Sequence, residues 1–331
     1  MTDATNAAAE IESLQHRVDA LREAVGHQFL GQKDVTELLL VALFAGGHAL
    51  LEGAPGLGKT TLVSSLARSL DLDFRRIQFT PDLMPPDILG TRILEFDEGG
   101  SRHFSFEQGP IFTQVLLADE INRATPRTQS ALLEAMQEGQ VTIFGETRSL
   151  DEPFMVIATQ NPIEMEGTYP LPEAQLDRFL VKIELAMPGR EALMRILDAT
   201  TGAPPAPAES VLEREQVLRL RELVRQVPAS SEVLRLVSNL VLATHPTSDL
   251  APERVKALVR YGSGPRGGQA LLLASKARAL LAGRLHVGQE DIASMAGPTL
   301  RHRLVLGYEG EASGVPVDDI VADALEAARK A

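Results

Sequence analysis

The chain has 331 residues, 44% of them hydrophobic and 23% charged, which is typical of a folded protein of about two domains. The net charge of −13 and the absence of Trp disfavour nucleic-acid binding, because such proteins neutralise phosphates with basic residues and stack bases on aromatic rings. The absence of Cys excludes disulfides, thiolate metal sites and Cys nucleophiles. Because the N-terminus is polar and the longest apolar stretch, residues 38–47, covers half a membrane span, we expect a cytoplasmic protein without a membrane-spanning segment.

Residues 1–30 are expected to form an N-terminal helical segment. Apolar residues recur there in alternating steps of three and four, which places them on one face of a helix: Ile11, Leu14, Val18, Leu21 and Val25. Two heptads are too short to argue for a coiled coil. The pattern therefore predicts a helix that packs against the domain that follows.

Residues 31–187 alternate helical patterns with short apolar runs, which predicts an α/β domain. The expected strands are apolar nearly throughout, as in a parallel sheet covered on both faces, and lie at 48–52, 76–79, 115–118, 155–159 and 180–185. Helical patterns between them include 60–70 and 128–138. Two hairpins interrupt this order, with strands at 92–96 and 102–106 and at 141–144 and 147–150.

Residues 188–331 show helical patterns only, which predicts a second, helical domain. The patterns lie at 190–199, 211–227, 231–243, 265–282 and 317–328. A Pro-rich loop is expected at 202–207.

The stretch after the first expected strand matches the phosphate-binding loop pattern G-x-x-x-x-G-K-[ST]. It consists of Gly53, Ala54, Pro55, Gly56, Leu57, Gly58, Lys59, Thr60 and Thr61. Its glycines let successive backbone N–H groups point at phosphates, and the following helix adds its positive N-terminal end. Lys59 is expected on the β- and γ-phosphates and the Thr60 hydroxyl on Mg²⁺.

A second acidic motif follows the expected strand at 115–118. Asp119 suits the carboxylate beside Mg²⁺, and Glu120 suits the group that activates the attacking water. Alone, the pair could be an ordinary acidic helix cap. Together with the phosphate loop, it indicates a nucleotide hydrolase.

Longer strings resemble the MoxR group of AAA+ ATPases. They are DEINRA at 119–124, QSALLE at 129–134, ATQNP at 158–162 and GTYPLPEAQLDRF at 167–179, and the resemblance covers about residues 28–310. It implies a five-stranded parallel AAA+ core followed by an all-helical lid domain, with ATP and Mg²⁺ bound between them.

The resemblance also implies roles for single residues. Asn161 resembles sensor 1, which helps to place the attacking water, although an Asn before Pro also suits a turn. Arg178 resembles the arginine finger that reaches the γ-phosphate in a neighbouring subunit. The alternative is that Arg178 forms an ordinary surface ion pair. Arg123 and Arg127 are weaker candidates for the same interface.

Arg266 resembles sensor 2, which would reach the nucleotide from the lid of the same chain. The sequence has Gly264 and Gly267 where the family pattern favours Ser and Ala. The segment beside the adenine would be Leu30, Gly31 and Gln32. ATP is favoured over GTP, because the chain lacks the N-K-x-D string that usually reads guanine.

The resemblance implies a homo-oligomeric ring, expected to be a hexamer, that matures or activates client enzymes or inserts metal or cofactor. A partner with a von Willebrand factor A domain is expected, and the two hairpins would face the pore or the client, unless they are surface decoration. The alternatives are a magnesium-chelatase-like motor subunit and a low-turnover, ATP-dependent scaffold. A DNA-remodelling ATPase is disfavoured by the acidic charge balance.

Overall fold

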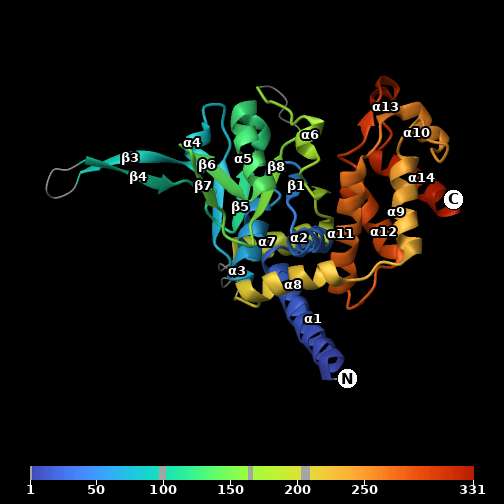
Figure 1. The fold of residues 1–331 in the computed structure, drawn as a ribbon, viewed down its shortest axis with the longest axis horizontal. Helices are drawn as coiled ribbons and strands as arrows, with labels where there is room; N and C mark the ends of the chain where they lie inside the picture. Colours follow the sequence, from blue (N-terminus) through green and yellow to red (C-terminus); the bar gives the residue numbers. More distant parts are fainter. Residues whose placement is uncertain (1, 97–101, 163–166, 203–208) are drawn as a thin grey trace.

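The computed structural model describes residues 2–96, 102–162, 167–202 and 209–331, with side chains from residue 14 onward. A parallel sheet with strand order β2-β5-β8-β1-β9 forms the centre of the molecule (Figure 1). Its strands are β1 (Ala49–Glu52), β2 (Phe74–Gln78), β5 (Val115–Asp119), β8 (Met155–Gln160) and β9 (Val181–Glu184). All five predicted strands are therefore confirmed, with ends shifted by one or two residues. The α/β class with a parallel sheet, which the alternating patterns predicted, is confirmed as well.

Helices cover both faces of this sheet, because inner strand residues alternate between two apolar layers. Leu51 and Ile157 pack on one face with α2 (Lys33–Phe44) and α3 (Lys59–Ser69). On the other face, Leu50 packs with α5 (Pro126–Glu138). Burial on both sides explains why the inner strands are apolar throughout. Strand β2 lies at the edge and carries exposed side chains there, Arg75 and Arg76.

The N-terminal helix α1 (Thr2–Gln28) packs against α2 and α3, as the apolar stripe predicted. Its described stripe residues are buried: Leu14, Val18, Leu21 and Val25. The side chain of Ile11 lies outside the described residues.

Both predicted hairpins are confirmed, and they contact each other. The first, β3 (Gly90–Phe96) with β4 (Arg102–Gln108), projects far from the body in Figure 1. Its expected turn lies outside the described residues. The second, β6 (Gln140–Ile143) with β7 (Glu146–Ser149), lies at its base. Arg92 joins the two hairpins, with Nη2 2.9 Å from Glu146 Oε1 and its guanidinium over the ring of Phe144.

The C-terminal part is helical, as predicted, but the patterns missed one of its longer helices, α12 (Gln289–Leu300). Its longer helices are α7 (Arg190–Thr201), α8 (Arg214–Gln226), α9 (Ser231–Ala243), α11 (Pro265–Leu281), α12 (Gln289–Leu300) and α14 (Val317–Lys330). Helix α8 packs on both α2 and α11, whereas the helices from α9 onward, here called the lid, stand beside the sheet (Figure 1). Of the expected Pro-rich loop, only Gly202 is described.

The lid also holds short elements that the patterns missed. Helices α10 (Glu253–Leu258) and α13 (Tyr308–Ser313) flank two strands, β10 (Val259–Tyr261) and β11 (Val305–Leu306), which pair antiparallel. The all-helical expectation is corrected by this small ribbon. Elsewhere the short elements are α4 (Pro85–Leu89), η1 (Ile121–Arg123) and α6 (Glu173–Leu176). Among the described residues, no helix is both long and apolar enough to cross a bilayer.

A buried histidine ties together the three elements that meet where β1 begins. His48 Nδ1 accepts a hydrogen bond of 3.0 Å from the backbone N–H of Val156, and its Nε2 lies 3.0 Å from the Met136 carbonyl oxygen. Burial lowers the pKa of His48 to about 4 from an ordinary value near 6.5. The neutral ring is therefore the form that the folded state retains.

This histidine makes stability depend on pH. Between about pH 6.5 and about pH 4, His48 binds a proton in the unfolded chain but stays neutral in the folded chain. The free energy of unfolding therefore falls by up to about 3 kcal/mol as the pH is lowered through this range. His48→Gln should be less stable than the parent at pH 7, and the gap should narrow toward pH 4 in urea unfolding. His286→Gln, at an exposed histidine, is the matched control. A gap for His48→Gln that stays constant with pH would contradict the assignment.

Candidate nucleotide-binding site

The predicted phosphate loop connects the carboxyl end of β1 to the first turn of α3. Gly56 and Gly58 have φ angles of +80° and +77°, in the left-handed region that glycine adopts without steric cost. Gly53 lies against the residue that follows β9, since a Cβ at this position would be 2.8 Å from the Cβ of Leu185. The glycines are thus required by the curl of the loop and by its close packing on the sheet.

Lys59 is the first residue of α3, and its side chain reaches back to the start of this loop. Its Nζ donates a hydrogen bond of 2.7 Å to the carbonyl oxygen of Gly53, at the start of the same loop. Partial burial lowers the pKa of Lys59, and the nearby carboxylates of Asp119, Glu120 and Glu52 oppose that shift. The ammonium is therefore held beside the two acidic residues that the sequence singled out.

Asp119 ends β5, the strand between β2 and β8. Its Oδ1 accepts a hydrogen bond of 2.6 Å from the Thr159 hydroxyl on β8. Its Oδ2 lies 2.6 Å from Arg76 Nη2 on β2. Both carboxylate oxygens are thus oriented by the neighbouring strands, and the side chain is only 14% exposed.

Glu120 follows in the left-handed conformation, with φ at +56°, which is uncommon outside glycine and is found at functional sites. Its backbone N–H donates to the Thr159 hydroxyl at 2.8 Å. Its Oε2 accepts hydrogen bonds from Gln78 Nε2 at 2.7 Å and from Arg123 Nη1 at 2.9 Å. The carboxylate of the expected catalytic residue is therefore held by polar partners in this conformation of the chain.

The sequence interpretation missed Arg76, Gln78 and Thr159. Arg76 and Gln78 are two residues apart on an edge strand and so share one face, and Gln78 is the register partner of Asp119. Their spacing was visible in the sequence. Only strand order and register bring them to the acidic pair.

Asn161 lies where predicted, directly after β8 at the same edge of the sheet. It is buried, with 4% of its surface exposed. The carbonyl oxygen of the preceding residue, Gln160, accepts a hydrogen bond of 3.3 Å from the backbone N–H of Gly53. The phosphate loop, the acidic pair and the candidate sensor 1 thus converge at one place.

A cavity of about 350 Å³ adjoins the phosphate loop, between the end of α1 and α7. Leu30 and Gln32, two of the residues predicted to lie beside the adenine, line it, and Gly31 packs closely on Ala192 of α7. The apolar wall from the start of the C-terminal part was not predicted: Met187, Pro188, Leu193 and Ile196. Its size and apolar lining suit a nucleoside.

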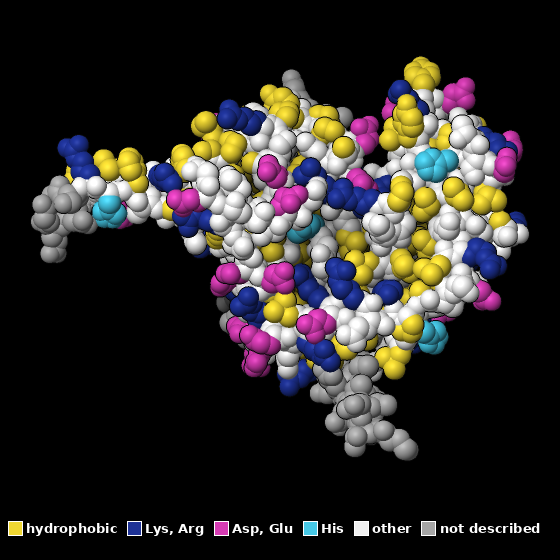
Figure 2. Space-filling view, in the orientation of Figure 1, with side chains coloured by type: hydrophobic (Ala, Val, Ile, Leu, Met, Phe, Trp, Pro, Cys, Tyr) yellow, Lys and Arg dark blue, Asp and Glu magenta, His cyan; other side chains and the backbone are white. Residues whose placement is uncertain are grey.

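Two predicted residues lie elsewhere. Arg178 and Arg266 line a second cavity, of about 260 Å³, together with Gly47 and His48 at the amino end of β1. Figure 2 shows Lys and Arg side chains gathered around the hollow between the sheet domain and the lid. The phosphate loop follows the opposite end of β1, and in this structure Arg266 Nη1 lies 3.6 Å from Asp177 Oδ2, so the role of Arg266 toward the nucleotide of its own chain stays a prediction.

The residues at the carboxyl edge fit a nucleotide with Mg²⁺. Thr60 and Asp119 would supply oxygen ligands of the kind that Mg²⁺ prefers, and this ion usually completes its shell with phosphates and water. Lys59 and the loop N–H groups suit the phosphates. When bound, the cation would neutralise charge on the phosphate oxygens.

A parallel sheet of this order, with a phosphate loop after β1 and an acidic pair after β5, is typical of an AAA+ ATPase. The family model described as "ATPase family associated with various cellular activities (AAA)" matches residues 48–181, and the model described as "AAA lid domain" matches residues 251–324. Within that class, the similarity to named relatives extends over nearly the whole chain. The chain belongs to the MoxR family of AAA+ ATPases.

Three relatives and one solved structure illustrate this similarity. Chaperone MoxR1 of Mycobacterium tuberculosis is 41% identical over 319 residues, which cover 96% of this chain and 82% of the relative. The uncharacterized protein YeaC of Bacillus subtilis is 42% identical over 310 residues, covering 93% and 92%. Protein MoxR of Paracoccus denitrificans is 35% identical over 296 residues, covering 84% and 85%. The crystal structure of a protein from Cytophaga hutchinsonii assigned as an ATPase superposes with a TM-score of 0.92, at 39% identity and 98% coverage of both chains.

The nucleoside cavity can be tested by filling it. Ile196→Trp places an indole in the space beside the phosphate loop and should weaken ATP binding by roughly 10-fold or more, because overpacking excludes the ligand. The neighbouring Leu197 is 55% exposed, so Leu197→Trp is the matched control and should bind ATP normally. Calorimetric titration measures both. Equal affinity in the two variants would show that ATP binds elsewhere.

Proposed function

We propose that this ATPase works as a ring, expected to be a hexamer, in which each active site is shared between two subunits. The observation that carries the proposal is the position of Arg178 and Arg266 at the amino edge of the sheet. Strand β1 alone, with four residues, separates this edge from the phosphate loop by roughly 13 Å. Arginines placed at this edge are suited to serve the nucleotide of a neighbour, and AAA+ proteins in general are oligomers.

The roles that we assign within one active site rest on the geometry together with the resemblance to the AAA+ family. Glu120 would act as the base for the attacking water once it leaves Gln78 and Arg123. Asn161 would help to place that water, and Lys59 would hold the phosphates. Arg178 of the adjacent subunit would add positive charge where negative charge grows in the transition state.

We also propose that hydrolysis drives chaperone-like maturation of client protein complexes. MoxR1 of Mycobacterium tuberculosis carries the name chaperone, which supports this role by similarity. The projecting hairpin supports it as well, since Phe96 and Phe104 expose 65% and 69% of their surface. Large exposed aromatic side chains are typical of protein-binding surfaces. A von Willebrand factor A domain partner and the insertion of metal or cofactor into the client complete the proposal.

Ring formation is testable with Glu120→Gln, which removes the base but keeps a side chain that binds the same partners. The variant should bind ATP and Mg²⁺ without turnover, and light scattering should show a shift from a smaller species to a closed ring when both are added. Lys59→Ala, which lacks the phosphate-binding ammonium, is the control that should not shift. A Glu120→Gln protein that binds ATP and stays monomeric would contradict the shared site.

The partner can be tested separately. A purified von Willebrand factor A domain protein from the same organism should bind the ring and change its ATPase rate at saturating ATP. Phe104→Ser on the projecting hairpin should weaken that binding by roughly 10-fold while the basal ATPase rate is kept, because a large exposed apolar anchor is removed. Absence of binding and of any effect on turnover would count against this part of the proposal.

A further inference from the structure

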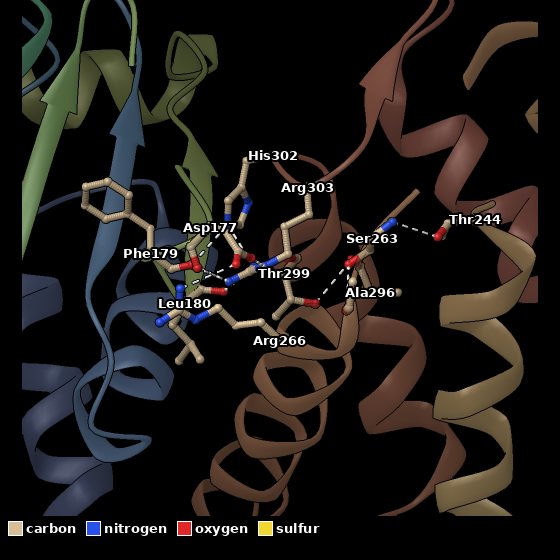
Figure 3. A network of polar contacts seen from close by, with 11 residues as sticks. Asp177, Phe179, Leu180, Thr244, Ser263, Arg266, Ala296, Thr299, His302 and Arg303 are labelled. Atoms are coloured by element: carbon tan, nitrogen blue, oxygen red, sulfur yellow. Dashed lines mark hydrogen bonds and ion pairs between the residues drawn. The ribbon is translucent and has the colours of Figure 1, made fainter. Parts of the chain in front are cut away.

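The segment that carries Arg178 is held by the lid. It runs from the end of α6 to the start of β9. Two residues that come shortly after α12 form hydrogen bonds with it, His302 and Arg303. Figure 3 shows both side chains directed from the lid toward Asp177, Phe179 and Leu180. These three surround Arg178 in sequence.

Arg303 donates most of the hydrogen bonds between the lid and this segment. Its Nε donates to Asp177 Oδ1 at 2.7 Å, and its Nη2 donates to the carbonyl oxygens of Phe179 at 2.7 Å and Asp177 at 3.1 Å. Its Nη1 donates to the carbonyl oxygens of Leu180, at 3.3 Å, and of Thr299 on α12. The side chain is only 3% exposed. A rigid, planar guanidinium that is hydrogen-bonded in this way fixes the distance between α12 and the segment that carries Arg178.

Other lid contacts strengthen the same connection. His302 Nε2 lies 3.0 Å from the Phe179 carbonyl oxygen and is buried, which keeps its pKa well below the ordinary value and its ring neutral. Asp177 faces a second lid arginine, Arg266 at the start of α11. The start of α11 also packs on Arg303, because a Cβ at Gly267 would lie 2.9 Å from Arg303 Cδ. Two lid helices therefore converge on one segment of the sheet domain.

We propose that Arg303 is a positioning residue for the arginine finger: it fixes the backbone on both sides of Arg178 to the lid, so the orientation of the lid sets whether Arg178 reaches the neighbouring active site. The proposal rests on the proposed function of Arg178. When the lid tilts against the sheet, the bonded carbonyls of Asp177, Phe179 and Leu180 move with it. Arg178 lies between them and is carried along.

This arrangement links the two nucleotide sites of adjacent subunits in one direction. The state of the lid in one subunit controls the finger that this subunit supplies, and so the hydrolysis in the next subunit. A residue that acts in this way affects turnover in the neighbour and leaves the ATP affinity of its own chain unchanged. That separation is the property to be measured.

Arg303→Met removes the guanidinium and keeps an apolar stem of similar length. It should lower kcat per subunit by roughly 10- to 100-fold, because a misplacement of about 1 Å costs this much in other enzymes, with ATP affinity within about 2-fold of the parent. Arg303→Lys keeps the charge but reaches fewer acceptors, so it should be intermediate. Arg284→Met breaks a partly buried ion pair with Asp291 inside the lid and is the matched control, with near-normal kcat.

Mixed rings locate the defect. A Glu120→Gln subunit has no turnover of its own but supplies intact Arg178 and Arg303 to its neighbour. Arg303→Met mixed with Glu120→Gln should therefore recover turnover well above the average of the two separate rings. Arg303→Met mixed with the double variant Glu120→Gln/Arg303→Met should show no recovery. Melting temperature and ring mass are measured alongside, and Arg303→Lys replaces Arg303→Met if the latter does not fold.

Arg178→Ala separates the possible outcomes. If Arg178→Ala keeps normal turnover, the proposed function of Arg178 is wrong. If Arg178→Ala loses turnover and is rescued by Glu120→Gln whereas Arg303→Met is not rescued, the finger stands and the positioning role is overturned. The role is supported when both variants are rescued and the double variant Arg178→Ala/Arg303→Met is no slower than Arg178→Ala alone.

Discussion

All five strands of the central sheet run in the same direction, and the chemistry of the molecule is arranged around that constraint. Parallel strands bring their carboxyl ends to one edge, so the phosphate loop, the acidic pair and Asn161 meet there without being neighbours in sequence. The segment before β9 necessarily emerges at the other edge, and it carries Arg178. A site divided between opposite edges of one sheet is incomplete in one chain. This is the physical basis for the shared active sites that we propose.

Opposite charges compensate one another at the carboxyl edge of the sheet. The ammonium of Lys59 lies near the carboxylates of Asp119 and Glu120. Each of these carboxylates also forms an ion pair with an arginine of the same domain. Arg76 is bonded to the oxygen of Asp119 opposite the one that Thr159 holds. A cation that binds Asp119 therefore competes with an arginine already in place. The edge strand β2 is thus part of the site as well as part of the sheet.

The lid is connected to the sheet domain through buried polar groups rather than through apolar contacts alone. Arg303 places a guanidinium where it is almost fully removed from water, which is costly unless every donor is bonded. Burial lowers its pKa, and Asp177 opposes that shift. Such bonds are directional, so they transmit orientation, whereas apolar packing would allow the two bodies to slide. This difference suits a coupling between lid movement and the position of Arg178.

The sequence by itself determined the elements and the local motifs. The phosphate loop, the acidic pair, the five strands and both hairpins are set by the order and spacing of neighbouring residues, which local backbone preference and periodicity reveal. The division into domains at residues 30 and 187 stays a prediction. Tertiary structure alone decided which edge each residue faces: it brought Arg76 and Gln78 to the acidic pair, α7 to the cavity beside the phosphate loop and Arg266 to Asp177. Strand order, register and the placement of the lid depend on contacts between residues far apart in the chain, and no local pattern records them.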